Sequence, residues 1–145
     1  YKREKWIVSA VSFTGADNFR AALAEHGVTS GVIMTQVVPP LDSHLPIVRA
    51  ARAALGEDFG YVSLEGFIVG QLWLKAMNDI RGPLTRAAFL DAVRGQRFDL
   101  GGLSMDFSDD NQGSDYVLLT HLTPAGFQVM RTHDWPSLAG SLASR

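Results

Sequence analysis

Residues 31–40 read Gly-Val-Ile-Met-Thr-Gln-Val-Val-Pro-Pro, and this stretch decides the fold class of the chain. It is rich in β-branched residues and nearly continuous in apolar ones, which is typical of a strand covered on both faces in a parallel sheet. The two prolines end the strand because neither has an N–H group to donate to a sheet ladder. We therefore predict a buried parallel strand that stops before Pro39.

The residues before this stretch supply the partner strand and the connecting helix. A short β-prone run over 7–13 ends at Thr14-Gly15, and residues 17–27 have helical spacing with a glycine at the end. Parallel strands need a crossover connection, which is usually a helix. The first 40 residues are therefore predicted to form a β-α-β unit, which places the chain in the α/β class.

Three helices with no strand between them are predicted for residues 41 to about 95. Apolar residues recur at three- and four-residue steps over 45–55, which describes an amphipathic helix. The segment 61–80 is apolar around most of its circumference, so we expect that helix to be largely buried. A third helix is expected over 83–93.

The last third of the chain has the pattern of short strands and turns. Residues 103–107 alternate between polar and apolar, residues 109–113 have turn chemistry, and residues 116–122 are β-prone. We predict an antiparallel hairpin in which 103–107 pairs with 116–122. A tight turn then precedes a short last strand over 127–130, and residues 131–145 are interpreted as a tail or linker.

The composition is that of an ordinary globular protein. Of the 145 residues, 46% are hydrophobic and 19% are charged, the formal net charge is -2, and there is no cysteine. The near-neutral balance leaves no basic face for phosphates, so no nucleic-acid partner is expected. The lack of cysteine excludes a disulfide framework, a thiolate zinc site and a cysteine nucleophile. No stretch reaches the about 18 apolar residues of a membrane span.

The histidines give no indication of a metal site. None of them pairs with another ligand at metal-binding spacing, so we predict neither a metal nor a cofactor. The acidic loop over 109–115 faintly resembles a calcium loop, but its ligand order differs from that of an EF-hand and no glutamate closes it. We interpret that loop as a hairpin turn.

Two places carry polar residues that could bind a ligand. Residues 12–14, Ser-Phe-Thr, follow the first strand at the edge where α/β sheets bind small molecules. The alternative is that Ser12 and Thr14 only end the strand and cap the helix. Glu65 is the sole charge on the first two turns of the long helix, and it is either a ligand-facing acid or a carboxylate stabilised by the helix dipole.

Catalytic motifs are missing. No Gly-x-Ser-x-Gly elbow, glycine-rich dinucleotide motif or phosphate-binding loop is present, and no Ser-His-Asp set can be nominated. We therefore predict that the chain is not an enzyme. The alternative is a small α/β enzyme built around Ser12, Thr14 and Glu65.

Six short segments, taken in order, carry a resemblance to a known family: 11–15, 31–39, 61–68, 84–89, 98–102 and 107–114. Together they resemble the C-terminal portion of type I periplasmic solute-binding proteins, in particular the leucine/isoleucine/valine-binding-protein family of ABC-transporter receptors. The resemblance covers roughly residues 7 to 130.

The resemblance implies a division of the chain between two lobes. Residues 1–40 would belong to the C-terminal lobe up to the hinge, and residues 41–97 would be helices of the other lobe. Residues 98–130 would return to the C-terminal lobe, with 131–145 as the tail. The helices would pack on a sheet from an N-terminal half that this chain lacks, because otherwise their apolar faces would be exposed.

The resemblance also implies a function. It is that of an extracytoplasmic or periplasmic module that binds an amino-acid-like or other small polar metabolite and presents it to an ABC transporter. In branched-chain amino-acid binders a carboxylate meets the ligand's ammonium group where this chain has Thr14, so a plain aliphatic amino acid is not assured. The family's ligand contacts match Ser12, Phe13, Thr14, Tyr61, Ser63 and Glu65.

Two further expectations concern partners and processing. The same fold also serves as the ligand-sensing domain of membrane receptors, and exposed helix faces could form a homo-oligomer. The stretch from Tyr1 to Trp6 carries neither an initiator methionine nor a secretion signal, so we expect a mature or excised chain whose precursor has a signal peptide.

Overall fold

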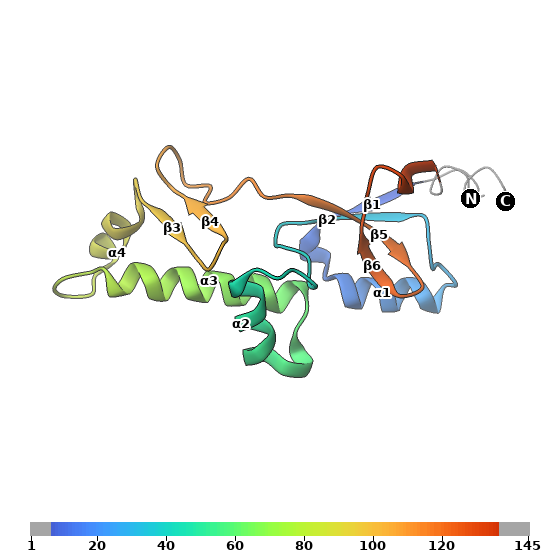
Figure 1. The fold of residues 1–145 in the computed structure, drawn as a ribbon, viewed down its shortest axis with the longest axis horizontal. Helices are drawn as coiled ribbons and strands as arrows, with labels where there is room; N and C mark the ends of the chain where they lie inside the picture. The colour runs from blue at the N-terminus through green and yellow to red at the C-terminus, as the bar shows by residue number, and fades with distance from the viewer. Residues whose placement is uncertain (1–6, 137–145) are drawn as a thin grey trace. The chain divides into compact units, whose positions relative to one another are not determined.

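The computed structural model describes residues 7–136, which divide into two compact units (Figure 1). The first unit comprises the described parts of residues 1–40 and 117–145, and the second unit comprises Leu41–Tyr116. Residues 98–116 lie in the second unit, whereas the resemblance implied a return to the first lobe at residue 98. Of the expected tail, residues 137–145 fall outside the described residues.

The first unit is a four-stranded mixed sheet with one helix. Strands β1 and β2 are parallel and are joined by α1, so the predicted β-α-β unit is confirmed. Strand β5 runs antiparallel to β2 on one side and to β6 on the other, which gives the strand order β1-β2-β5-β6. The elements are β1 (Val8–Ala10), α1 (Ala16–Glu25), β2 (Val32–Gln36), β5 (Leu118–Thr123) and β6 (Gly126–Val129).

Strand β2 lies at the centre of the first unit's core. Val32 and Met34 have almost no exposed surface, as the continuous apolar pattern predicts. The hydroxyl of Thr120 donates a buried hydrogen bond of 2.9 Å to the carbonyl oxygen of Met34, which ties β5 to β2. The central strand is therefore held by both burial and side-chain hydrogen bonding.

The second unit contains the three predicted helices and a two-stranded sheet. Helix α2 begins with Pro46, whose missing N–H needs no partner there, and it ends before Gly56 at φ 56°. The Thr85 hydroxyl accepts a 3.1 Å hydrogen bond from the Ala88 amide and caps α4. The elements are α2 (Pro46–Leu55), α3 (Tyr61–Asn78), α4 (Arg86–Val93), β3 (Arg97–Asp99) and β4 (Ser104–Asp106).

The predicted hairpin between 103–107 and 116–122 is wrong. Strand β4 pairs with β3 instead, through a tight turn, and β5 pairs with β2 and β6. Gly101 and Gly102 adopt φ angles of 75° and 87°, which glycine reaches without steric cost. The glycine pair thus forms the turn of the β3–β4 hairpin. The acidic loop over 109–113 lies between β4 and β5, which belong to two different sheets.

The prediction that the long helix is largely buried is also wrong. Only Tyr61, Leu64, Ile68 and Ala76 of α3 are buried. Val62 and Val69 are each 60% exposed and Trp73 is 51% exposed. The contacts of α3 with α2 and α4 cover one stripe of the helix and leave the rest of its apolar surface open.

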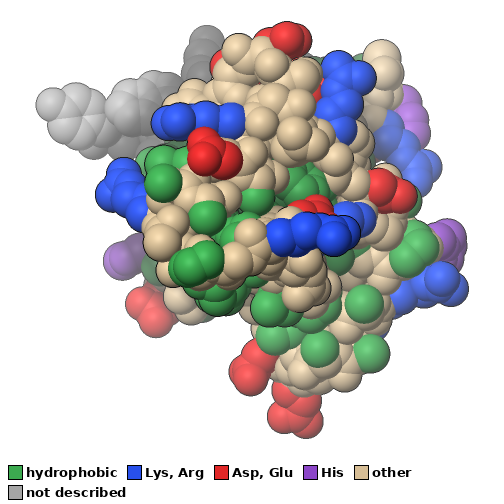
Figure 2. Space-filling model, turned by 90° about the vertical axis from the view of Figure 1, so that its left-hand side faces the viewer, with side chains coloured by type: hydrophobic (Ala, Val, Ile, Leu, Met, Phe, Trp, Pro, Cys, Tyr) green, Lys and Arg blue, Asp and Glu red, His purple; other side chains and the backbone are tan. Residues whose placement is uncertain are grey.

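Leu84, in the segment between α3 and α4, is also exposed, at 63%. Figure 2 views the molecule from the side that carries α4 in Figure 1 and shows hydrophobic side chains at the surface there. Within residues 7–136, no helix combines the length and the apolar character needed to cross a lipid bilayer.

Candidate functional site

Ser12, Phe13 and Thr14 form a single 3-10 turn directly after β1 (Figure 1). The amide and the hydroxyl of Thr14 both donate to the carbonyl oxygen of Val11, at 3.1 and 2.8 Å. Gly15 follows with φ 74° and serves as the N-cap of α1. The chain therefore reverses within four residues, from the end of a strand to the beginning of a helix.

This turn has the features of a ligand-binding edge. It lies at the carboxyl end of a parallel strand and at the N-terminus of α1, where backbone N–H groups favour anionic groups. Gly15 offers no side chain to cap those N–H groups. Phe13 is 87% exposed, which is unusual for a large apolar side chain. The predicted position of the turn at the strand end is confirmed, and its ligand contacts stay a prediction.

Tyr61, Ser63 and Glu65 lie together on the first two turns of α3 in the second unit. Tyr61 is buried and Glu65 is exposed. The Ser63 hydroxyl accepts a 2.8 Å hydrogen bond from the Gly60 amide and lies 2.6 Å from the carbonyl oxygen of Asp58. Ser63 thus organises the beginning of the helix, a role that the sequence prediction did not include.

In the structure, the six predicted residues form two separate groups. Ser12, Phe13 and Thr14 share one turn of the first unit, and Tyr61, Ser63 and Glu65 share one helix end of the second. Each group combines an aromatic ring with hydroxyl groups, and the second adds a carboxylate. Such a set can bind a small polar molecule by hydrogen bonds and stacking.

Sequence reasoning missed one polar residue near the first group. Gln36 ends β2, is 1% exposed, and has no hydrogen-bond partner for its side-chain oxygen or nitrogen among the described residues. The signal that could have identified it is a polar amide at the last position of a strand whose first three residues are apolar.

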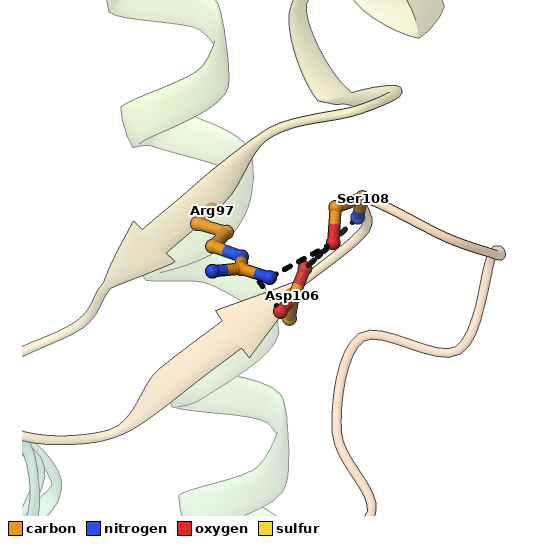
Figure 3. A network of polar contacts seen from close by, with 3 residues as sticks. All are labelled: Arg97, Asp106 and Ser108. Carbon is orange, nitrogen blue, oxygen red and sulfur yellow. Dashed lines mark hydrogen bonds and ion pairs between the residues drawn. The ribbon is translucent and has the colours of Figure 1, made fainter.

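The polar cluster around Asp106 has a structural role in the β3–β4 hairpin (Figure 3). Its carboxylate accepts hydrogen bonds from the hydroxyl and the amide of Ser108 and is paired with Arg97 at 2.8 Å. The hydroxyl of Ser108, then its amide, and the nearby Arg97 lower the pKa of Asp106 below its ordinary value.

The acidic loop that resembles a calcium site uses its carboxylates for its own backbone and side chains. Asp110 accepts from the Gln112 amide at 2.7 Å, and Asp115 accepts from the Gln112 side chain at 2.8 Å. Over residues 7–136, no three histidine or acidic side chains are grouped so that they could hold a metal ion.

Comparisons with known proteins identify the architecture. No protein-family model matches the chain, and no curated protein matches it significantly. A solved structure described as a possible leucine/isoleucine/valine-binding protein from Rhodopirellula baltica SH 1 matches 90% of the chain, with 34% identity and a TM-score of 0.77. An extracellular ligand-binding receptor from Verminephrobacter eiseniae ef01-2 matches 85%, with 26% identity and a TM-score of 0.70.

A third structure supports the fold alone. This extracellular ligand-binding receptor from Desulfohalobium retbaense DSM5692 matches 86% of the chain, with 20% identity and a TM-score of 0.57. The chain spans 36%, 37% and 27% of the lengths of these three proteins. The resemblance drawn from the sequence is confirmed: the chain has part of the α/β fold of type I periplasmic binding proteins and is similar to a leucine/isoleucine/valine-binding-like protein.

Proposed function

We propose that the chain is part of an extracytoplasmic protein that binds a small polar metabolite of the amino-acid class and delivers it to an ABC uptake system. The observation that carries this proposal is the match over 90% of the chain, at 34% identity, to a possible leucine/isoleucine/valine-binding protein. The neighbours are described as binding proteins and receptors, which favours a noncatalytic role.

Each of the two groups of residues, taken by itself, carries chemistry that suits a charged group of an amino acid. The open N–H groups at the beginning of α1, next to Ser12 and Thr14, favour a carboxylate. The exposed carboxylate of Glu65 favours an ammonium group, and the ring of Phe13 offers apolar area.

The exposed apolar side of α3 supports the proposed division between lobes. We assign the second-unit helices to the lobe whose sheet comes from elsewhere in a longer protein, so that Val62, Val69 and Trp73 become covered there. Tryptophan fluorescence tests this in a background in which Trp6 and Trp135 are replaced by Phe. Acrylamide should quench Trp73 less in the full-length protein than in the 145-residue chain, and equal quenching would contradict the assignment.

Ligand binding is tested by thermal shift and calorimetry on the full-length protein with single amino acids, amides and small carboxylates. A ligand at 100 times its dissociation constant should stabilise the protein by about 2.7 kcal/mol, which is several degrees in melting temperature. Thr14→Val, which keeps the shape and removes the hydroxyl, should reduce that shift. If no compound shifts the melting temperature of the wild-type protein, the proposal is contradicted.

A ligand-sensing domain of a membrane receptor is the second candidate. It is favoured by the description of two neighbours as extracellular ligand-binding receptors. Uptake of the radiolabelled ligand in a deletion strain separates the two roles. Loss of uptake supports the transport role, whereas normal uptake with a lost cellular response supports the sensor.

The enzyme and oligomer alternatives have simple tests. An enzyme built around Ser12, Thr14 and Glu65 would lose turnover of the bound compound in the Glu65→Gln variant, whereas a binding protein shows no turnover to lose.

An interaction module that oligomerises through its helix faces would have a molar mass above that of a monomer when it is measured by light scattering.

A further inference from the structure

Gln36 is an anomaly in the core of the first unit. Its side chain is 1% exposed, yet neither its amide nitrogen nor its amide oxygen has a hydrogen-bond partner among the described residues. Buried polar side chains in native proteins nearly always have a partner, because an unmet donor or acceptor costs about 1–3 kcal/mol. Because the unpaired amide carries this cost, we expect the protein to have a second state in which the amide is hydrogen-bonded.

The candidate partner that the strand register indicates is the hydroxyl of Ser12. The parallel register sets Ala10 opposite Met34, and Val11 continues in an extended conformation. Continued by two residues, this register brings Ser12, the first residue of the 3-10 turn after β1, beside Gln36, the last residue of β2. The turn and β2 are in contact. Alternation along β2 keeps Gln36 on the same face of the sheet as Met34.

The Ser12 hydroxyl is itself available. Ser12 is half-buried, and its hydroxyl makes no hydrogen bond within the part of the chain that the structure describes. A hydroxyl can donate to the amide oxygen of Gln36 or accept from its nitrogen, so a hydrogen bond between the two would give both groups a partner. By contrast, the Thr14 hydroxyl in the same turn already donates to Val11.

We propose that Gln36 is a positioning residue for the ligand-binding turn, and that its amide bonds the Ser12 hydroxyl when a ligand occupies that turn. This rests on the proposed function, because it needs a ligand at residues 12–14. The bond would fix the turn in its binding geometry. It would also couple ligand occupancy to residues 37–40, through which the chain passes directly from β2 into the second unit.

The test uses Gln36→Met, which keeps the length and apolar volume of the side chain and removes the amide. In the absence of ligand, this variant should melt at or above the temperature of the wild type, since it removes an unbonded polar group from the core. A drop of several degrees would show that the amide is already bonded without ligand and would overturn the proposal.

The second arm measures affinity by calorimetry in the full-length protein, with the twenty proteinogenic amino acids tested singly as probes. For the amino acid that binds the wild type, Gln36→Met should weaken binding about tenfold. Ser12→Ala should weaken it similarly in the wild type but by no more than about twofold in the Gln36→Met background, because the two groups act as a pair. Thr35→Val, a neighbouring change on the opposite face of β2, is the matched control and should leave the affinity unchanged.

The outcomes separate this inference from the function beneath it. Equal affinities of the wild type and Gln36→Met, or additive effects of Gln36→Met and Ser12→Ala, overturn the role of Gln36 while the binding function stands. No binding of any amino acid to the wild type overturns the amino-acid class and the role of Gln36 with it.

Discussion

The hydroxyl oxygen of Ser63 lies 2.8 Å from the amide nitrogen of Gly60 and accepts its hydrogen bond. Since the same hydroxyl donates to the carbonyl oxygen of Asp58 at 2.6 Å, its single proton is already used. Ser63 could therefore offer a ligand only its remaining lone pair. Its larger contribution is to the beginning of α3.

Ser63→Ala should lower the free energy of unfolding by about 1 kcal/mol, because the Gly60 amide loses its partner at the helix start. Urea denaturation monitored by circular dichroism measures this loss. Ser63→Thr keeps the hydroxyl and should retain most of the stability. If Ser63→Ala is as stable as the wild type, the hydrogen bond to Gly60 does not hold the helix end.

Phe13→Ala should separate binding from stability. The Phe13 side chain is 87% exposed, so its removal should change the free energy of unfolding by less than about 0.5 kcal/mol. The dissociation constant of the ligand should nevertheless rise about tenfold if the ring contacts the ligand. Leu84→Ala is the control, because Leu84 is 63% exposed and lies outside both groups of candidate residues. Unchanged affinity in Phe13→Ala would remove Phe13 from the site.

Local signals in the sequence were sufficient to predict the β-α-β unit and the three helices. The glycine at 27, the prolines at 39 and 40 and the cap at Thr85 act within one turn of the backbone they shape, so a single sequence reveals them. Strand pairing could not be predicted in the same way. The Thr120 hydroxyl bonds the Met34 carbonyl across 86 positions of sequence, and no local pattern specifies that partner.

The candidate site was predictable to a similar degree. The strand end before Thr14 marks a ligand-binding edge in any α/β sheet, so residues 12–14 could be nominated. The state of Gln36 could not be predicted, because only the packed structure reveals that its amide is buried without a hydrogen-bond partner among residues 7–136. The apolar pattern of residues 61–80 shows which side chains avoid water, but it does not identify the surface that would cover Trp73, which is 51% exposed.

The contact between the β3–β4 turn and α2 should make Gly101 sensitive to substitution. A Cβ atom at Gly101 would lie 3.0 Å from the Ile47 amide nitrogen, which donates a 3.2 Å hydrogen bond to the Gly101 carbonyl. Gly101→Ala should therefore lower the free energy of unfolding by roughly 2–3 kcal/mol, from a positive φ of 75° and from this close approach.

Gly95→Ala provides the matched control in the same unit. Gly95 has a φ of 71°, close to that of Gly101, but a Cβ atom there would meet no atom of the described part of the chain within 4 Å, apart from its own chain neighbours. Its substitution should cost about 1 kcal/mol, which is the backbone strain alone. Urea denaturation of both variants gives the difference. Equal losses would show that the turn does not press against the beginning of α2.

The hydrogen bonds from Ser108 to Asp106 predict a pH effect on the β3–β4 hairpin. The lowered pKa of Asp106 arises first from the Ser108 hydroxyl, then from the Ser108 amide and from Arg97. A carboxyl group whose folded pKa lies below its unfolded value contributes stability above the unfolded pKa and loses it as the pH falls through the folded one. The contribution of Asp106 should thus be complete above pH 3.8, its ordinary value, and decline below it.

Carbon-13 NMR titration of the Asp106 carboxyl group tests the cause of this shift. Ser108→Ala should raise the pKa of Asp106 back toward 3.8, because it removes the largest single contribution. Ser114→Ala is the control, since the Ser114 hydroxyl accepts from the Tyr116 amide, and it should leave the Asp106 titration unchanged. If the Asp106 carboxyl group titrates in Ser108→Ala as it does in the wild type, then the ion pair with Arg97, not Ser108, lowers its pKa and sets the pH at which the hairpin loses stability.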